Sequence, residues 1–287
     1  MTRTIRKTAA TAAAVALSLA ALNAHAANVL VVLSDASQLE LRDKRTFDTG
    51  FYANELMQPV KKLLDAGHTI TFATPLGKVP ALDRNSVDKM YFDNDEASMQ
   101  QHLALLEKLR ITSAEQSPVV SLARVEQGGY ARYDAVYVPG GHAPMQDLLH
   151  SPALGRLLRD FHARAKPTAL VCHGPIALLS ALERPEQFTS KLASPAAAAA
   201  ASAAPAWIYA GYQMTVISNS EEEAAKGMLN GGTMKILPQT ALQRAGGVYS
   251  SAANWQSKVV VDRELITGQN PASATAVADQ LLARLKP

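Results

Sequence analysis

Short uninterrupted apolar runs, alternating with segments of helical spacing, constrain the fold of this chain more than any other feature. The first run covers residues 28–34, and its continuous apolar character is typical of a strand buried on both faces. Residues 51–66 then carry apolar side chains at helical spacing and end before Gly67, and a β-branched run covers residues 69–74. This strand–helix–strand order favours a parallel sheet with right-handed crossover connections.

The same alternation continues towards the C-terminus. The pattern predicts strands at 134–138, 168–171 and 213–217, helices at 96–110, 151–165, 176–182 and 272–285, and a hairpin formed by 258–261 and 265–267. An Ala-rich stretch at 194–206 is expected to form a loop or an inserted helix. We therefore predict a single α/β domain over residues 27–287, a flavodoxin-like parallel-sheet sandwich with helices on both faces and a C-terminal β-hairpin.

The N-terminal 26 residues contain the three parts of a secretory signal in order. Basic residues (Arg3, Arg6 and Lys7) precede the uncharged, Ala-rich and Leu-rich stretch 8–22, and Ala24-His25-Ala26 forms an A-x-A cleavage site. The apolar stretch is short for a membrane span, so we expect cleavage after Ala26 and a periplasmic or secreted protein with no membrane contact thereafter.

Charge narrows the range of partners. Removal of the signal takes away three of the 28 basic residues, so the remaining basic residues equal the 25 acidic ones in number. No positive excess is left to attract nucleic acid or an anionic membrane. The composition, with 48% hydrophobic and 18% charged residues, is that of a globular protein.

The chain has a single cysteine, Cys172, which an exported protein cannot use for an internal disulfide. One interpretation is a buried cysteine that acts as a small hydrophobe. The other follows from its position directly after the predicted strand 168–171 and before Gly174-Pro175, which open the next helix. This sharp strand-to-helix turn resembles a nucleophile elbow, and the helix N-terminus is expected to lower the pKa of the thiol.

Two other loops reach the same edge of the predicted sheet. Gly140-Gly141 ends the strand 134–138 and would present backbone N–H groups as an oxyanion hole, although Pro139-Gly140-Gly141 is also an ordinary turn sequence. Glu55 lies near the start of the first helix, where a carboxyl held beside a thiolate would be protonated and donate a hydrogen bond to sulfur. On spacing alone, a solvated helix face is the better interpretation for Glu55.

Together these residues resemble a known family. The chain is similar to the ThiJ/PfpI superfamily, which has the class I glutamine amidotransferase-like fold, and to its branch of heat-shock chaperones and glutathione-independent glyoxalase III proteins. The matching stretches, in family order, are Thr49-Gly50-Phe51 with Glu55, Ala66-Gly67-His68, Thr74-Pro75-Leu76-Gly77, Leu82-Asp83 with Ser86, Pro139-Gly140-Gly141-His142, Asp147-Leu148, Val171-Cys172-His173-Gly174-Pro175, residues 215–222 and residues 267–273.

The resemblance implies a role for several positions. Cys172 corresponds to the nucleophile, His173 to the adjacent histidine of the triad-bearing branch, and Glu55 to the acid that contacts the nucleophile. The third triad member is an acid after the strand that contains Thr215, for which spacing favours Glu222.

Some of these assignments leave alternatives open. Glu221 and Glu223 are the residues that a slip of one position would select in place of Glu222. Gly141, with the backbone of His173, would supply oxyanion donors, and Gly140 and His142 would border the substrate.

The implied activity is the conversion of methylglyoxal, or a related 2-oxoaldehyde, to a 2-hydroxy acid such as D-lactate without glutathione or another cofactor. The rival hypotheses are a holdase chaperone or stress protein, a Cys-His peptidase or amidohydrolase, and a redox sensor that uses the exposed thiol. The family also implies a homodimer. No metal is expected, because the six histidines outside the signal form no i, i+4 pair, although a site built from distant residues such as His142 and a carboxylate stays open.

Overall fold

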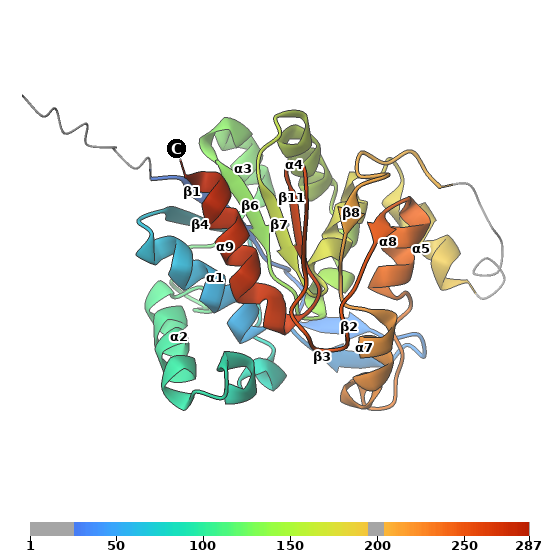
Figure 1. Cartoon of the computed structure of the whole chain (residues 1–287), viewed down its shortest axis with the longest axis horizontal. Coiled ribbons are helices and arrows are strands. Elements are labelled where there is room, and N and C mark those ends of the chain that lie inside the picture. Colours follow the sequence, from blue (N-terminus) through green and yellow to red (C-terminus); the bar gives the residue numbers. More distant parts are fainter. Residues whose placement is uncertain (1–25, 195–203, 287) are drawn as a thin grey trace, which may run out of the picture.

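A seven-stranded sheet forms the centre of the computed structural model, which describes residues 26–194 and 204–286 (Figure 1). The strands are β1 (Asn28–Val32), β2 (Gln38–Glu40), β3 (Thr46–Asp48), β4 (Thr69–Thr74), β5 (Val120–Ser121), β6 (Ala135–Val138), β7 (Thr168–Val171), β8 (Gln213–Met214), β9 (Val248–Tyr249), β10 (Val259–Asp262) and β11 (Leu265–Gly268). The main sheet has the order β10-β11-β7-β6-β1-β4-β5, and the pairs β2-β3 and β8-β9 form two small separate sheets.

Helices flank the main sheet. The α-helices are α1 (Ala53–Asp65), α2 (Glu96–Leu109), α3 (Leu122–Gly128), α4 (Pro152–Ala163), α5 (Pro185–Ala193), α7 (Asn219–Ala224), α8 (Pro238–Ala245) and α9 (Ala274–Leu285). The 3-10 helices are η1 (Arg84–Ser86), η2 (Lys89–Phe92), η3 (Tyr130–Arg132), η4 (Ala143–Met145), η5 (Leu148–His150), η6 (Gly174–Ala181), η7 (Lys226–Leu229) and η8 (Pro271–Ser273). None of the helices in these described ranges is both long enough and apolar enough to cross a membrane.

The predicted fold class is confirmed. Strand β1 pairs in parallel with β4 on one side and β6 on the other, and among the described strands of the main sheet only β10 runs against its neighbour. The parallel order β4-β1-β6-β7-β11 matches the flavodoxin-like arrangement, in which ligands bind beyond the carboxyl ends of the strands. The antiparallel C-terminal hairpin is β10-β11, and it extends the main sheet through pairing of β11 with β7.

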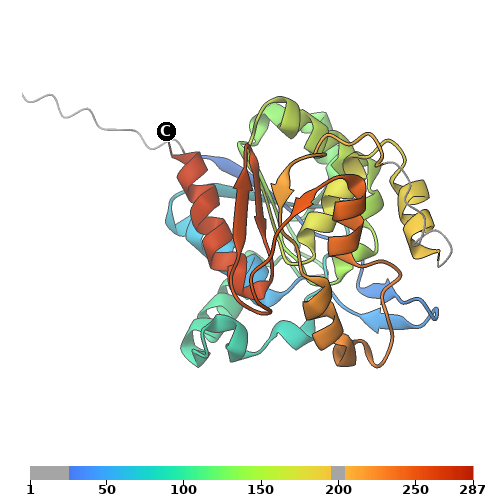
Figure 2. The same ribbon diagram turned by 45° about the vertical axis from the view of Figure 1, so that its right-hand side comes forward.

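Both faces of the sheet are covered, which explains why its strands are continuous apolar runs (Figures 1 and 2). Helices α1 and α9 pack against each other on one face, and α4 packs with α3 and η6 on the other. The apolar stripes of the helices face the sheet, as the side chains of Leu56, Val60 and Leu63 in α1 show. The burial of one such side chain stabilises the fold by roughly 1.5–3 kcal/mol.

Two predicted elements differ from the structure, and several short elements were not predicted. The strand expected over 213–217 is limited to the two residues of β8, because the N–H of Thr215 donates to the side-chain Oγ1 of Thr267 at 2.9 Å instead of to a backbone carbonyl of a neighbouring strand. The helix expected at 176–182 is the 3-10 helix η6, which starts earlier at Gly174. The β2-β3 hairpin was not predicted, because each strand has only three residues and a single buried one. The predicted signal peptide, apart from Ala26, and most of the Ala-rich stretch lie outside the described residues.

Candidate active site

Cys172 lies at a sharp turn directly after β7. Its φ of 60° is in the left-handed region, which costs a non-glycine residue about 1–3 kcal/mol and is maintained only where the surroundings enforce it. The Cys172 N–H donates to the Gly268 carbonyl at 2.9 Å, and the Cys172 carbonyl accepts from the Ile217 N–H at 3.0 Å. A Cβ on Gly174 would lie 2.5 Å from the Val138 carbonyl oxygen, so only glycine permits this close approach. The turn therefore has the geometry of a nucleophile elbow.

A chain of three side chains leads away from the sulfur. Cys172 Sγ lies 3.3 Å from His173 Nδ1, and His173 Nε2 lies 2.8 Å from Glu222 Oε1. All three side chains are buried. Burial alone would lower the pKa of His173, but the negative charge of the nearby Glu222 carboxylate raises that pKa above its ordinary value. The arrangement stabilises a positive charge on the ring once it has accepted the proton of the thiol, as in other thiol–imidazole–acid sites.

Three consecutive glutamates at the start of α7 have three different environments. Glu221 forms a capping box with Ser218, so its side chain is turned inward to the helix N-terminus. Glu223 is exposed and pairs with Lys226 at 3.3 Å. Glu222 alone among the three faces His173, so the structure places the residue favoured by spacing next to the imidazole.

Glu55 is fully buried next to the elbow, so the solvated helix face is the wrong interpretation for this residue. Its Oε2 accepts a hydrogen bond from the Gly140 N–H at 2.7 Å. Burial raises the pKa of Glu55 to about 7, against the opposing hydrogen bonds from Cys172 and Gly140. A carboxyl with its pKa raised in this way can carry a proton near neutral pH, and it can then donate a hydrogen bond to the sulfur.

The pKa of the Cys172 thiol is shifted in the opposite direction to the prediction. Burial raises the pKa of Cys172 well above its ordinary value, and the charge of Glu55 raises it further. The expectation of a lowered pKa is therefore wrong: it relied on a helix N-terminus, whereas η6 is a 3-10 helix and the cysteine is only 3% exposed. A thiolate at this site requires a proton on Glu55 and a positive charge on His173.

The two glycines after β6 shape the floor of the site. A Cβ on Gly140 would lie 2.7 Å from the Cβ of Cys172, and one on Gly141, whose φ is 85°, would overlap the Gly50 carbonyl. The Gly140 N–H is already bonded to Glu55, so the prediction that it serves as an oxyanion donor is wrong. Gly140 instead orients the carboxyl of Glu55, while the oxyanion role of Gly141 and the His173 backbone stays a prediction.

Comparison with known proteins gives the family. Residues 47–234, about two thirds of the chain, match the sequence profile described as ThiJ/PfpI family-like. This chain belongs to the ThiJ/PfpI family. A curated relative is the glutamine amidotransferase-like class 1 domain-containing protein 1 of Danio rerio, with 30% identity over 165 residues, 58% of this chain and 67% of the relative. The bovine protein of that name is covered over 64% of its length, so the chain spans about two thirds of these relatives.

Other relatives align with a larger part of this ThiJ/PfpI-family chain. The protein/nucleic acid deglycase HchA of Staphylococcus aureus is 26% identical over 246 residues, 85% of this chain and 74% of the relative. The Francisella tularensis rapid encystment protein REP24 superposes with a TM-score of 0.68 at 25% identity, over 91% of this chain and 100% of that structure. The Candida albicans glyoxalase III has a TM-score of 0.61 at 19% identity, over 91% and 98%, and shares the fold.

A cavity of about 740 Å³ lies next to the Cys172 thiol, which forms part of its wall. Its wall includes side chains that sequence reasoning missed, namely Tyr52, Tyr91, Met90, Met228 and Trp255. Of these five, only Tyr52 could have been placed at the site from the sequence. It lies three residues before Glu55, and residues at this spacing lie on the same side of a helix. Met90, Met228 and Trp255 are also exposed, so the mouth of the cavity is rich in apolar surface.

His142 lies at the inner end of this cavity and beside the triad. Its ring centroid is 4.3 Å from that of His173, and the backbone N–H of His142 donates to Thr49 Oγ1 at 3.2 Å. Burial, with a smaller contribution from the charge of His173, lowers the pKa of His142 well below its ordinary value. His142 is therefore a neutral imidazole next to the catalytic candidate.

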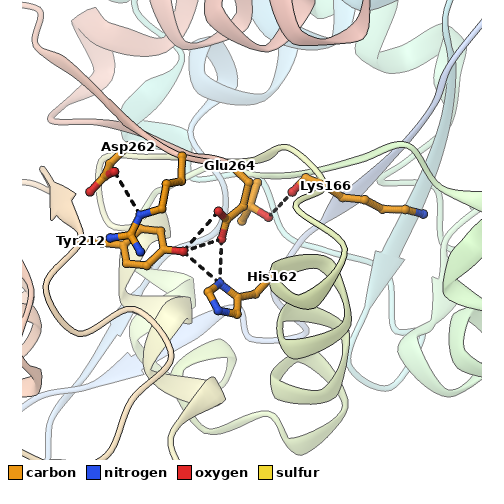
Figure 3. A network of polar contacts seen from close by, with 7 residues as sticks. His162, Lys166, Tyr212, Asp262 and Glu264 are labelled. Atoms are coloured by element: carbon orange, nitrogen blue, oxygen red, sulfur yellow. Dashed lines mark hydrogen bonds and ion pairs between the residues drawn. The ribbon is translucent and has the colours of Figure 1, made fainter.

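A second His–Glu pair lies at the opposite, amino-terminal edge of the sheet (Figure 3). His162 Nδ1, at the end of α4, is 2.8 Å from Glu264 Oε1, which lies in the turn between β10 and β11. The Tyr212 hydroxyl contacts both carboxylate oxygens of Glu264, at 3.2 and 3.3 Å. This cluster ties α4 and the residues before β8 to the C-terminal hairpin, with no thiol near it.

Proposed function

We propose that this ThiJ/PfpI-family protein is a glyoxalase III-like cysteine enzyme, which converts methylglyoxal or a related 2-oxoaldehyde to a 2-hydroxy acid without glutathione. The observation that carries the proposal is the buried chain from Cys172 through His173 to Glu222, with the protonatable Glu55 on the other side of the sulfur. The names of the HchA deglycase relative and the glyoxalase III structure support chemistry on 2-oxoaldehydes or their adducts.

The reaction begins when His173 Nδ1 accepts the proton of the Cys172 thiol, across 3.3 Å. The sulfur then bonds to the aldehyde carbon, and the carbonyl oxygen takes a proton to give a hemithioacetal. His173 removes the hydrogen from that carbon to form an enediol and returns a proton to the neighbouring carbon, which yields a thioester. Water cleaves the thioester, so that D-lactate leaves and the thiolate is regenerated. Water is the only co-reactant consumed.

The residues around this chain have separate tasks. Glu222 holds the ring of His173 and stabilises its positive charge while the proton resides there. Glu55 in its protonated form donates a hydrogen bond to the sulfur, and the Gly140 N–H keeps its carboxyl in place. The Gly141 and His173 N–H groups are proposed to stabilise the oxyanion.

A second candidate reaction is favoured by the size of the cavity. About 740 Å³ falls in the range of pockets for drug-sized ligands, far beyond the five heavy atoms of methylglyoxal. Such a pocket has room for a 2-oxoaldehyde already added to an amine. Attack by Cys172 on that adduct would release the amine and give the same hemithioacetal, after which the steps are unchanged.

One experiment tests both reactions. The purified protein without residues 1–26 is incubated with methylglyoxal, and the D-lactate formed is measured next to Cys172→Ala. Absence of lactate formation, under conditions in which a known glyoxalase III is active, would overturn the proposal. The adduct of methylglyoxal with N-acetylarginine is then supplied, and amine release faster than spontaneous dissociation identifies the second reaction.

The location and assembly of the protein are also proposals. We propose export to the periplasm or the medium, with cleavage after Ala26, and assembly as a homodimer. Cell fractionation with N-terminal sequencing checks the first point, because the mature chain would begin at Ala27. Light scattering of the purified protein checks the second, for which a monomeric mass is the contradicting result.

A further inference from the structure

Three buried side chains around the triad bring potential metal-ligand atoms together. The side chains are His142, His173 and Glu222, and one ligand atom from each lies within 4.8 Å of the others. They come from the loop after β6, the elbow after β7 and the first turn of α7. Each of the three is less than 8% exposed, and all three line the cavity.

The bonding capacity of this cluster is not filled. His142 Nδ1, His173 Nε2 and Glu222 Oε1 are all buried and lack a hydrogen-bond partner among the described residues. His173 Nε2 and Glu222 Oε1 are 2.8 Å apart, but their contact does not have the direction of a hydrogen bond. A buried polar atom without a partner costs about 1–3 kcal/mol, so unpartnered atoms on three neighbouring side chains point to a ligand that these side chains share.

Two imidazoles and one carboxylate form a ligand set that suits zinc. Open zinc sites use three protein ligands, His₂Glu among them, and leave a fourth position to water or substrate. Bonds of about 2.0–2.2 Å place the ligand atoms of a tetrahedral ion roughly 3.4 Å apart, so small side-chain rotations bring this cluster into range. The fourth position would face the cavity.

We propose that His142, His173 and Glu222 bind one Zn²⁺ ion, and that the bound ion blocks the thiol chemistry. A neutral imidazole has one lone pair, and coordination through Nε2 uses it. His173 Nδ1 then carries the ring proton and donates it towards Cys172 Sγ, so the ring no longer accepts the proton of the thiol. At the same time Glu222, as a zinc ligand, no longer stabilises a positive charge on His173.

The Glu264 cluster provides a control within the same protein. Its carboxylate oxygens are shared by His162 and Tyr212, and its place in the turn gives it no second histidine. We therefore expect zinc to bind at the triad and not at this second His–Glu pair.

The test measures binding directly. The protein is stripped with EDTA, transferred to a chelator-free buffer with a non-thiol reductant, and titrated with Zn²⁺ in a calorimeter. We expect one ion per chain. His142→Gln should weaken binding by on the order of 100-fold, while the matched control His162→Gln should leave it unchanged. Circular dichroism verifies that each variant is folded.

Cys172→Ser separates this site from ordinary capture of zinc by a thiol. We expect this variant to retain zinc, and Co²⁺ in the wild-type protein to show tetrahedral absorption bands without a thiolate charge-transfer band. X-ray absorption at the zinc edge should show only nitrogen and oxygen ligands, which tests the proposal even if His142→Gln does not fold. Loss of zinc in Cys172→Ser, unchanged binding in His142→Gln, or a sulfur ligand overturns the proposal.

The blocking effect has its own readout. Alkylation of Cys172 by iodoacetamide should slow at least 10-fold when one equivalent of zinc is added and recover with EDTA. An unchanged alkylation rate at saturating zinc would overturn the claim of inhibition. Neither measurement uses methylglyoxal, so the result is independent of the proposed reaction.

Discussion

The two His–Glu pairs of this protein have the same contact distance and opposite surroundings. His173–Glu222 and His162–Glu264 are both separated by 2.8 Å. At the carboxyl edge of the sheet, the first pair is next to a thiol and a cavity, and buried nitrogen and oxygen atoms lack partners. At the amino edge, the second pair shares its carboxylate with Tyr212 (Figure 3). The difference shows that unfilled bonding capacity, and not contact distance, marks the pair that is available for chemistry.

The largest expected effect comes from removing the nucleophile next to the first pair. Cys172→Ala should reduce lactate formation from methylglyoxal by about 10⁴-fold or more, to the background rate, because no other thiol is present. His162→Gln, at the second pair, should retain activity within about twofold in a folded protein. A comparable loss of lactate formation in both variants would contradict the claim that only the first pair takes part in the reaction.

The next prediction concerns Glu222, the carboxylate of the first pair. Glu222→Gln should lower kcat by about 10²–10⁴-fold, because the amide no longer supports the charge of His173. The midpoint of urea unfolding should change little. A loss of stability with full activity would show that Glu222 is only structural.

The reverse result is expected at the second pair. Glu264→Gln should lower the free energy of unfolding by about 1–3 kcal/mol, because His162 and Tyr212 lose a charged hydrogen-bond partner in a buried place. Turnover of the folded variant should be unchanged. Urea unfolding followed by circular dichroism measures the first quantity, and an unaltered midpoint would contradict the assignment.

The smallest expected effect is a change in pH profile. Glu55 has a pKa of about 7, so above that pH its charge opposes the formation of the thiolate. Glu55→Gln removes this charge, and its thiol should titrate at a lower pH than in the wild-type protein. Thiolate absorbance and the rate of alkylation against pH should therefore diverge above about pH 7. Superimposable curves would show that Glu55 does not control the thiol.

Much of the fold could be predicted because both faces of the sheet are covered. The bounds of β7, which is buried along its whole length, and of the β-branched β4, which is buried in its second half, agree with the sequence prediction. Short elements with few buried residues, such as β2 and β3, lack such a pattern. The two-residue strand β8 was overextended in the prediction because residues 215–217 are buried by contacts other than strand pairing.

The site could be predicted in part, because Cys172, His173 and the glycines carry local signals. The direction of the thiol pKa could not, since it depends on how deeply the finished fold buries the sulfur and on the distance to Glu55. The sequence predicted the pairing of His173 with Glu222 and left open a site formed by His142 and a carboxylate. It did not predict that all three meet, because they lie on separate segments that only the sheet order brings together.

The hydrogen bonds that hold the elbow have a consequence for how the protein matures. The backbone of Cys172 is fixed on one side by Gly268 and on the other by Ile217, both far along the chain. The strained turn therefore cannot be maintained until the C-terminal hairpin has docked onto β7, and contacts of such long range form late in folding. A chain that is still being synthesised carries an ordinary cysteine. Cys172 thus adopts its elbow conformation only when the fold is complete.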